Sequence, residues 1–250
     1  MQRAEDDWHR DFFDGLWLQV QRQSFSASEN TEIVDSIVDI LQLPAAARVL
    51  DVPCGDGRTA LELATRNFEL TGVESSTAML QRAREEADRR QLSISWIQQD
   101  MWSLNAGTGF AAAICPWTSL GYGTRKQDQV FFDAVAGSLD DSGLFLFETH
   151  VYETLLHGFE ENLARRAGDV LVVEERDFDT EQGRLYTDWT FLRGSEQETR
   201  KSAMQLYTVR ELDSMLGRAG MTTIASWGSW DLDAFEVGAP ILVQLARKGG

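Results

Sequence analysis

One stretch of the sequence, VLDVPCGDGRTALELA at residues 49–64, restricts the possible folds more than any other. Its apolar start predicts a buried strand, Gly55 and Gly57 predict a tight turn, and the remainder predicts an amphipathic helix. A second apolar run then ends on Glu74. Because glycine lacks a Cβ, the backbone of such a turn can approach a ligand closely. The stretch therefore predicts a strand–turn–helix–strand unit that binds a ligand at its turn.

The acidic residues around this turn indicate the kind of ligand. Glu74 is expected at the carboxyl end of the second strand, where a carboxylate can accept hydrogen bonds from both hydroxyls of a ribose. The spacing Gly55-x-Gly57-x-x-Ala60 also satisfies the loose dinucleotide fingerprint. Asp51, however, closes the first strand so near the turn that it would repel a pyrophosphate. A nucleoside with a positive charge suits this turn better, and S-adenosylmethionine (SAM) is such a ligand.

At these residues the chain resembles the class I SAM-dependent methyltransferases, whose first motif is an acidic residue followed by a Gly-x-Gly turn. In particular, it looks like a bacterial group of small-molecule methyltransferases with the motif LD-x-PCG-x-GR, in which Pro53 stands where many relatives have glycine. The resemblance implies SAM as cofactor and S-adenosylhomocysteine as product. It places the cofactor against the first motif and the second strand, at Asp51, Pro53, Cys54, Gly55, Gly57 and Glu74.

Helical and strand patterns alternate along most of the chain, which is typical of a doubly wound parallel α/β sheet. Helices are predicted at residues 8–21, 29–41, 75–90, 127–139 and 209–219, with Ser28 as a cap of the second. Strands are predicted at residues 49–52, 68–73, 92–97, 110–115, 144–148, 221–227 and 240–247. The resemblance implies that these seven strands form the Rossmann-like class I sheet, with the last strand antiparallel to the rest.

After the fifth strand the pattern changes to an alternation with period two. Residues 170–177, 185–192 and 201–207 read as three strands without a crossover helix, which predicts an inserted antiparallel β flap. The segments RLYTDWTF and QLYT within it match the same bacterial group. The predicted organisation is a helical lid at residues 1–45, a SAM-binding core at 46–150 and 208–250, and a substrate flap at 151–207.

Further cofactor contacts are expected in the loops after the strands, where open α/β sheets bind ligands. By resemblance, Asp100 accepts from the adenine amino group and the Met101 backbone serves a ring nitrogen. Asp100 is alternatively a turn cap. Ser75 and Met79 are expected to line the adenine, although Met79 reads equally as helix core. Trp17 is expected in a lid over SAM because related enzymes use that helix in this way, or else in a helix core face.

The acceptor side is predicted in the loop CPWTSLGYG and beyond it. Pro116 shapes this loop, and the rings of Trp117 and Tyr122 can hold a sulfonium or ammonium by cation–π attraction. In the resembling group the loop contacts the methionine end of SAM and the substrate. His150 is the best-placed general base because imidazole titrates near neutrality, although a lone histidine is often structural. Tyr207 is expected to cover the substrate from the flap.

Composition and residue content limit the classes of partner that the chain is expected to bind. The net charge of −17 over 250 residues argues against nucleic acid, since Lys and Arg supply most of the affinity for a phosphate backbone. Cys54 and Cys115 read as reduced thiols rather than a disulfide, and no His, Cys and carboxylate cluster predicts a metal. Neither a membrane span nor a signal peptide is apparent, which predicts a cytoplasmic protein. A homodimer is possible, and the oligomeric state is open.

The sequence therefore predicts methyl transfer from SAM to nitrogen or oxygen of a small molecule, and it leaves three alternatives open. A methyltransferase-like protein can use SAM for a non-methyl reaction, such as intramolecular cyclisation of its aminobutyrate arm. The glycine turn also permits an NAD(P)-dependent oxidoreductase. A non-catalytic SAM-binding subunit is the third alternative, because no single residue makes catalysis certain.

Overall fold

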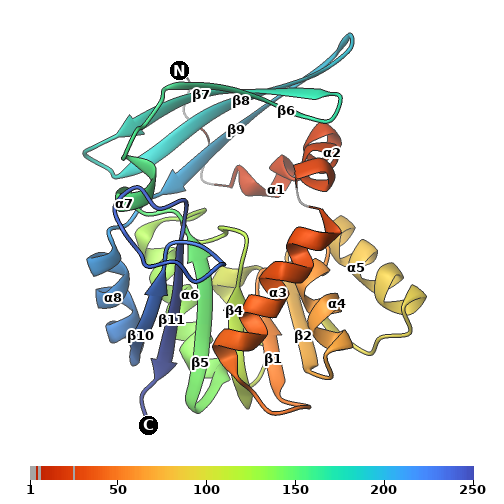
Figure 1. The fold of residues 1–250 in the computed structure, drawn as a ribbon, viewed down its shortest axis with the longest axis vertical. Helices are drawn as coiled ribbons and strands as arrows, with labels where there is room; N and C mark the ends of the chain where they lie inside the picture. The colour runs from red at the N-terminus through yellow and green to blue at the C-terminus, as the bar shows by residue number, and fades with distance from the viewer. Residues whose placement is uncertain (1–3, 5–6, 25) are drawn as a thin grey trace.

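The computed structural model describes residue 4, residues 7–24 and residues 26–250 (Figure 1). Its larger sheet has seven strands in the order β10-β11-β5-β4-β1-β2-β3. Their bounds are β1 (Arg48–Asp51), β2 (Glu69–Glu74), β3 (Ser95–Gln98), β4 (Phe110–Cys115), β5 (Leu139–Thr149), β10 (Met221–Trp227) and β11 (Leu242–Lys248). β1 to β5 pair in parallel, and β11 runs antiparallel to both of its neighbours. The predicted doubly wound sheet with an antiparallel last strand is confirmed.

Helices cover both faces of this sheet, because successive strand residues point to opposite sides. Leu146 packs in a cluster with α3 (Ala27–Leu41) and α4 (Arg58–Thr65), and α5 (Thr77–Arg89) lies beside α4. Phe145 and Phe147 point the other way, toward α6 (Arg125–Ser138) and α8 (Val209–Arg218). A separate core therefore lies on each side of the sheet.

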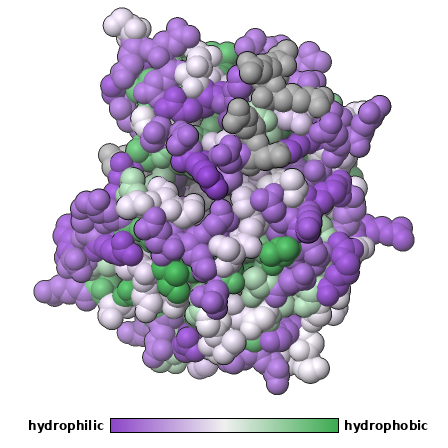
Figure 2. Space-filling view, turned by 180° about the vertical axis from the view of Figure 1, so that it is seen from behind, coloured by the Kyte–Doolittle hydropathy of each residue, from purple (hydrophilic) through white to green (hydrophobic). Residues whose placement is uncertain are grey.

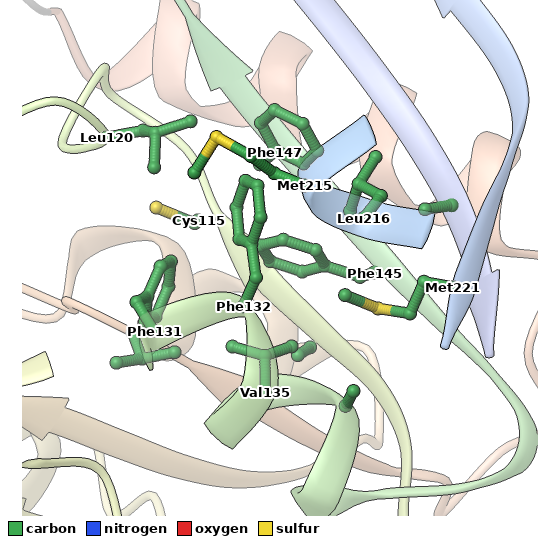
Figure 3. Packing of buried hydrophobic residues seen from close by; sticks show 14 of the residues in the cluster. Cys115, Leu120, Phe131, Phe132, Val135, Phe145, Phe147, Met215, Leu216 and Met221 are labelled. Carbon is green, nitrogen blue, oxygen red and sulfur yellow. The ribbon is translucent and has the colours of Figure 1, made fainter. Parts of the chain in front are cut away.

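The core under α6 and α8 is built largely from phenylalanine rings (Figure 3). Phe132 of α6 meets Phe145 of β5 edge-on at a centroid distance of 5.8 Å, and Phe145 stacks on Phe147 at 5.0 Å. All three rings are fully buried, and burying an aromatic side chain contributes roughly 2–3 kcal/mol. This packing fixes the carboxyl ends of β4 and β5, which carry the loops of the candidate site.

A second sheet, called the flap below, follows β5. It is antiparallel, in the order β6 (Asn162–Ala167), β7 (Val170–Asp179), β8 (Arg184–Arg193) and β9 (Glu196–Gln205). An antiparallel flap was predicted, but with three strands rather than four. β6 reads NLARRA and is mostly exposed, so it lacks the apolar alternation that revealed the other three. The flap stands above the carboxyl edge of the larger sheet (Figure 1).

Residues 7–24, called the lid segment below, lie between the flap and the core (Figure 1). The predicted single helix at residues 8–21 is two helices, α1 (His9–Phe12) and α2 (Gly15–Ser24), because the backbone turns at Gly15 with φ +55°. Leu16 and Val20 of α2 are buried against the flap residues Val170, Val172 and Phe191. The lid segment thus shares a hydrophobic core with the flap.

The third helix of the chain belongs to the larger sheet instead. Val34, Ile37 and Leu41 of α3 pack on the sheet, whereas the lid segment packs against the flap, so the described part of the predicted lid at residues 1–45 is divided between the two. The predicted cap at Ser28 is wrong. Ser26 caps α3, forming a reciprocal capping box with Glu29.

The surface is mainly hydrophilic, as the acidic composition leads one to expect. On the face shown in Figure 2, hydrophobic residues form only small separate patches. Val237 is the most exposed large hydrophobic side chain among the described residues. Within that part of the chain, no helix is long and apolar enough to cross a membrane.

Candidate cofactor and acceptor site

The glycine turn after β1 is tied to the strands on both sides of it. The Val52 amide donates to the Ile114 carbonyl at 3.0 Å, and the Cys54 amide donates to the Val73 carbonyl at 2.9 Å. A Cβ on Gly57 would lie 2.6 Å from the Trp96 ring, so this position tolerates no side chain. A Cβ on Gly55 would meet nothing within 4 Å. The turn is therefore closed toward the protein at Gly57 and open at Gly55.

Glu74, at the end of β2, lies beside this turn. Its carboxylate accepts hydrogen bonds from the Gly55 amide at 3.1 Å, the Ser76 amide at 2.8 Å and the Ser75 hydroxyl at 3.2 Å. Ser76 in turn caps α5, because its hydroxyl accepts from the Met79 amide. The structure brings the first motif, Glu74 and Ser75 together at one edge of the sheet, while Met79 is a buried residue of α5.

Asp51 is a buried acid at the end of β1. Its side chain is 1% exposed, and neither carboxylate oxygen has a hydrogen-bond partner of ordinary geometry among the described residues. Burial raises the pKa of Asp51 to about 8; the neighbouring Glu74 and Asp56 raise it further, and the Ala60 backbone opposes the change. A cation held beside Asp51 would reverse the effect of burial. This orphaned carboxyl, next to the open position at Gly55, fits a ligand with a positive charge.

The two cysteines near this turn are buried and unpaired. Cys54 lies in the turn, preceded by Pro53, whose peptide bond with Val52 is cis. Burial raises the pKa of both Cys54 and Cys115, so both are thiols at neutral pH. No group of three or more His, Cys, Asp or Glu side chains gathers in the described part of the chain in a way that suits a metal ion.

Asp100 precedes the short helix η1 (Met101–Ser103) and serves as its cap. Its Oδ1 accepts a hydrogen bond from the Trp102 amide at 2.9 Å, which is the turn-cap arrangement that the sequence left open. Asp100 also lines a cavity of about 610 Å³, together with Trp102 and with His9 of the lid segment. Met101 is buried beneath it. Capping and ligand binding by Asp100 are compatible, because the cap occupies one of its two oxygens.

Glu148, near the end of β5, organises the loop after β4. Its carboxylate accepts from the Thr118 hydroxyl at 2.7 Å, the Trp117 amide at 3.3 Å and the Trp230 indole at 2.8 Å. Trp117 and Thr118 both have positive φ angles, 68° and 58°, which are unfavourable for residues with a Cβ. Sequence analysis assigned Glu148 no role. The signal that could have found it is an acid at the carboxyl end of an otherwise apolar strand.

Trp117 covers the start of α4. Its indole N–H donates to the Thr59 hydroxyl at 3.1 Å, and the Arg58 guanidinium lies 4.9 Å from the ring centroid. Arg58 and Thr59 directly follow the glycine turn, and Pro116 beside Trp117 is buried. The structure therefore places Trp117 next to the predicted cofactor turn.

Tyr122 packs against the lid segment. Its ring stacks on Phe13 at a centroid distance of 5.7 Å and meets Trp8 edge-on at 4.9 Å. Burial raises the pKa of Tyr122 well above its usual value, so the phenol is neutral. Trp17 is farther into the flap, meeting Trp189 at 5.8 Å. Trp8, which sequence analysis missed, connects the core loop to the flap because its indole donates to the Ala203 carbonyl at 3.0 Å.

His150 follows β5 and is half-buried. Its Nδ1 is buried and has no hydrogen-bond partner among the described residues. Burial lowers the pKa of His150, Glu148 opposes this change and Arg176 adds to it. The imidazole is therefore neutral at pH 7 and able to accept a proton.

Tyr207 lies beneath the flap in the hydrophobic core and is 1% exposed. Its hydroxyl donates to Asp128 Oδ2 at 2.6 Å, and the Arg125 guanidinium lies over its ring. Burial raises the pKa of Asp128 to about 6, and the hydrogen bond from Tyr207 lowers it in part. The hydroxyl of Tyr207 is thus engaged by a buried carboxyl, and its predicted contact with substrate stays a prediction.

Comparison with known proteins identifies the region that carries the first motif. Residues 49–143 match the family described as methyltransferase domain. "Putative methyltransferase GWCH70_2453" of Geobacillus sp. (strain WCH70) is 33% identical over 117 residues, which is 46% of this chain and 47% of that protein. "Putative methyltransferase YqeM" of Bacillus subtilis is 36% identical over 110 residues, or 43% of this chain and 44% of that protein. The chain thus spans less than half the length of these relatives.

The chain also matches part of an RNA-modifying enzyme. The 23S rRNA (uracil(1939)-C(5))-methyltransferase RlmD of Alkalilimnicola ehrlichii is 35% identical over 43% of this chain and 22% of its own length. Solved structures match nearly the whole chain. The CcbJ methyltransferase of Streptomyces caelestis has a TM-score of 0.85 at 17% identity, over 99% of this chain and 100% of its own. CalS10, a SAM-bound amino pentose methyltransferase of Micromonospora echinaspora, has a TM-score of 0.71 at 22% identity, over 96% and 99%. At these identities the likeness establishes the methyltransferase fold.

Proposed function

We propose that this chain is a class I SAM-dependent methyltransferase that transfers a methyl group to nitrogen or oxygen of a small molecule. The observation that carries the proposal is the buried carboxyl of Asp51, which has no hydrogen-bond partner of ordinary geometry among the described residues and lies beside a turn that is open at Gly55. Such a group destabilises the protein unless a ligand compensates it, and a cationic amino-acid tail is the matching ligand. The methyltransferase domain match over residues 49–143 and the shared fold support the same assignment.

The residues of the site divide into two groups by what they would hold. In the first, Asp51, Gly55 and Glu74 hold the amino-acid tail and the ribose, and Asp100 with Met101 holds the adenine. In the second, the loop around Trp117 and Tyr122 faces the reacting end. When bound, SAM supplies a methyl group on a sulfonium, which is already an activated leaving group. The protein therefore contributes mainly orientation, which can supply about 7–11 kcal/mol in favourable cases.

We assign His150 the role of general base for an acceptor that must lose a proton, such as a hydroxyl. Its neutral imidazole supports this role, as does an Nδ1 atom that lacks a hydrogen-bond partner in the described part of the chain. An amine that arrives neutral needs no base. For Tyr207, which the sequence predicted to cover the substrate, we propose a positioning role, because its hydroxyl donates to Asp128.

A small acceptor is favoured over RNA. The net charge of −17 disfavours a phosphate backbone, and the match to RlmD spans 22% of that protein. Several structural neighbours act on small molecules by their descriptions: CalS10 is an amino pentose methyltransferase, KedS8 a sugar N-methyltransferase and MtfA a glycopeptide N-methyltransferase. These share the fold with this chain, including the region of the flap in matches that cover more than 94% of it.

The proposal is tested first by calorimetry and then by turnover. We expect wild-type protein to bind S-adenosylhomocysteine and to ignore NADH. With SAM and a panel of amines, hydroxylated small molecules and amino sugars, S-adenosylhomocysteine is expected to form only when an acceptor is present. Release of methylthioadenosine from SAM alone would instead indicate cyclisation of the aminobutyrate arm. Affinity for NADH without affinity for SAM or its product would overturn the assignment.

A further inference from the structure

A cavity of about 610 Å³ lies at the seam between the lid segment and the core. Asp7, His9 and Arg10 line it from the lid segment, and Asp100 and Trp102 are among the core residues that line it from the opposite side. Asp100 is the residue proposed above to accept from the adenine amino group. The lid segment and Asp100 thus face each other across this cavity.

His9 is the lid-segment residue of this cavity whose polar atoms lack a described partner. Its ring meets the Trp102 ring at a right angle with a centroid distance of 5.0 Å, which fixes the orientation of the imidazole. Both ring nitrogens are buried and have no hydrogen-bond partner among the described residues. Buried polar atoms are normally paired, because an unsatisfied one costs about 1–3 kcal/mol. The two nitrogens therefore indicate a partner that the described residues do not supply.

The cavity presents complementary polar and aromatic groups to such a partner. A neutral imidazole offers one donor and one acceptor, and burial lowers the pKa of His9 so that this neutral form prevails. Asp100 offers its second carboxylate oxygen, because Oδ1 is engaged by the Trp102 amide. A planar base with an amino donor and ring-nitrogen acceptors matches this set. Among the parts of SAM, only the adenine has that chemistry.

We infer that His9 is a cofactor-specificity residue. It hydrogen-bonds the adenine base from the side of the cavity that lies opposite Asp100. The inference rests on the proposed function, since it presupposes SAM as the ligand. It gives the lid segment a direct part in cofactor recognition that neither the glycine turn nor the loop after β4 provides.

Because the lid segment is bound to the flap, the contact between His9 and adenine also couples cofactor binding to the position of the flap, which forms the acceptor side of the site. The Leu16 amide donates to Glu198 at 3.1 Å, Asp14 pairs with Arg200 at 2.7 Å, and the Trp8 indole donates to the flap backbone. Adenine held by His9 would therefore hold the flap over the site as well.

The test compares two ligands that share the adenosine end. Wild type, His9→Phe and the control His157→Phe are titrated calorimetrically with S-adenosylhomocysteine and with methylthioadenosine, which lacks the amino-acid tail. Phenylalanine keeps the ring contact with Trp102 and removes both nitrogens, while His157 is exposed and does not line this cavity. We expect His9→Phe to weaken both ligands by about tenfold. His157→Phe should bind both as wild type does.

A second pair of variants separates recognition from folding. His9→Asn retains a donor and an acceptor and is expected to lose less affinity than His9→Phe, whereas a purely structural histidine would give no such rescue. Asp51→Asn should weaken S-adenosylhomocysteine more than methylthioadenosine, because it acts on the tail.

The outcomes distinguish the inference from the proposed function. Equal affinity of wild type and His9→Phe for both ligands would refute the role of His9 and leave the SAM assignment intact. A loss of affinity confined to S-adenosylhomocysteine would show that His9 acts on the amino-acid tail rather than on the adenine, and it would also refute the proposed role of His9. If wild type binds neither ligand, the proposed function and this inference fail together.

Discussion

At the scale of single residues, the site contains side chains whose environment is unfavourable in the free protein. Asp51 is the clearest case, since its carboxyl lies at the end of a buried strand with no hydrogen-bond partner of ordinary geometry among the described residues. His150 and His9 likewise have buried nitrogens that no described residue hydrogen-bonds. Such groups cost stability, and proteins retain them where function needs them. Each offers a measurement of its role.

Asp51→Asn is expected to make the ligand-free protein more stable at alkaline pH. The folded-state pKa of about 8 lies above the unfolded value, so protonated Asp51 favours the folded state at low pH. The free energy of unfolding therefore falls as pH rises from about 4 to about 8, by at most about 1.4 kcal/mol per pH unit. The asparagine variant cannot ionise at this position and does not show this fall. Urea unfolding at pH 5 and pH 8 should show a variant advantage that grows with pH. A constant difference would contradict the ionisation argument.

His150→Asn is expected to lower kcat roughly 10²–10⁴-fold for a hydroxyl acceptor and to leave an amine acceptor little affected. Because the pKa of His150 is lowered, the wild-type acid limb of kcat/KM should lie below pH 6.5, and it should vanish in the variant. The measurement is the pH profile of both proteins with each acceptor class. An acid limb that persists in the variant would assign the base to another residue.

At the scale of elements, loops are held by single carboxylates at strand ends. Glu74 fastens the glycine turn to β2, and Glu148 fastens the loop after β4 to β5 and to Trp230. A carboxylate accepts several donors at once, so one residue sets the shape of a whole loop. The loops that bear the chemistry are thereby attached to the rigid sheet.

Glu148→Gln is expected to destabilise the protein by about 1–3 kcal/mol, because one of its oxygens becomes an amide that faces donors. KM for the acceptor should rise as the loop with Trp117 loses its fixed shape. Guanidinium unfolding and steady-state kinetics check both effects. The matched control is Glu69→Gln, an exposed position at the start of β2, which should change neither.

The elements of the core were predictable because their apolar periodicity is local in the sequence. Strands such as β4 were predicted with the observed bounds, and the acids after them lie where parallel strand ends meet. β6 was missed because an exposed edge strand carries no apolar pattern. The role of Glu148 depends on Trp230, which is 82 positions away, and that of Tyr207 on Asp128. Such pairings arise only in the folded chain.

At the scale of the whole molecule, the lid segment and the flap behave as one layer above the core. They share a hydrophobic cluster, and the polar contacts of Asp14 and Leu16 go to the flap strand β9. Contacts with the core include aromatic ring contacts, such as those of Trp8 and Phe13 with Tyr122. Substrate entry is therefore expected to separate the layer from the core rather than the lid segment from the flap.

Hydrogen exchange tests this division. Amides of α2 and β9 should exchange on a common timescale, faster than those of β1 and β4, and S-adenosylhomocysteine should slow α2 and β9 together. Glu198→Gln is expected to accelerate exchange in α2, because Glu198 accepts from the Leu16 amide. Protection of α2 at the level of β4, with rapid exchange in the flap, would contradict a common layer.

The flap begins and ends at neighbouring points of the core, since the Tyr152 amide donates to the Tyr207 carbonyl at 2.9 Å. Because its two ends are adjacent, such an insertion can be replaced by that of a relative without disturbing the cofactor site below it. The partnership with the amino-terminal helices adds a condition for such grafting. A chimera that receives the flap of another protein must receive residues 7–24 from the same protein. A change in the range of acceptor substrates is therefore expected to need both segments together.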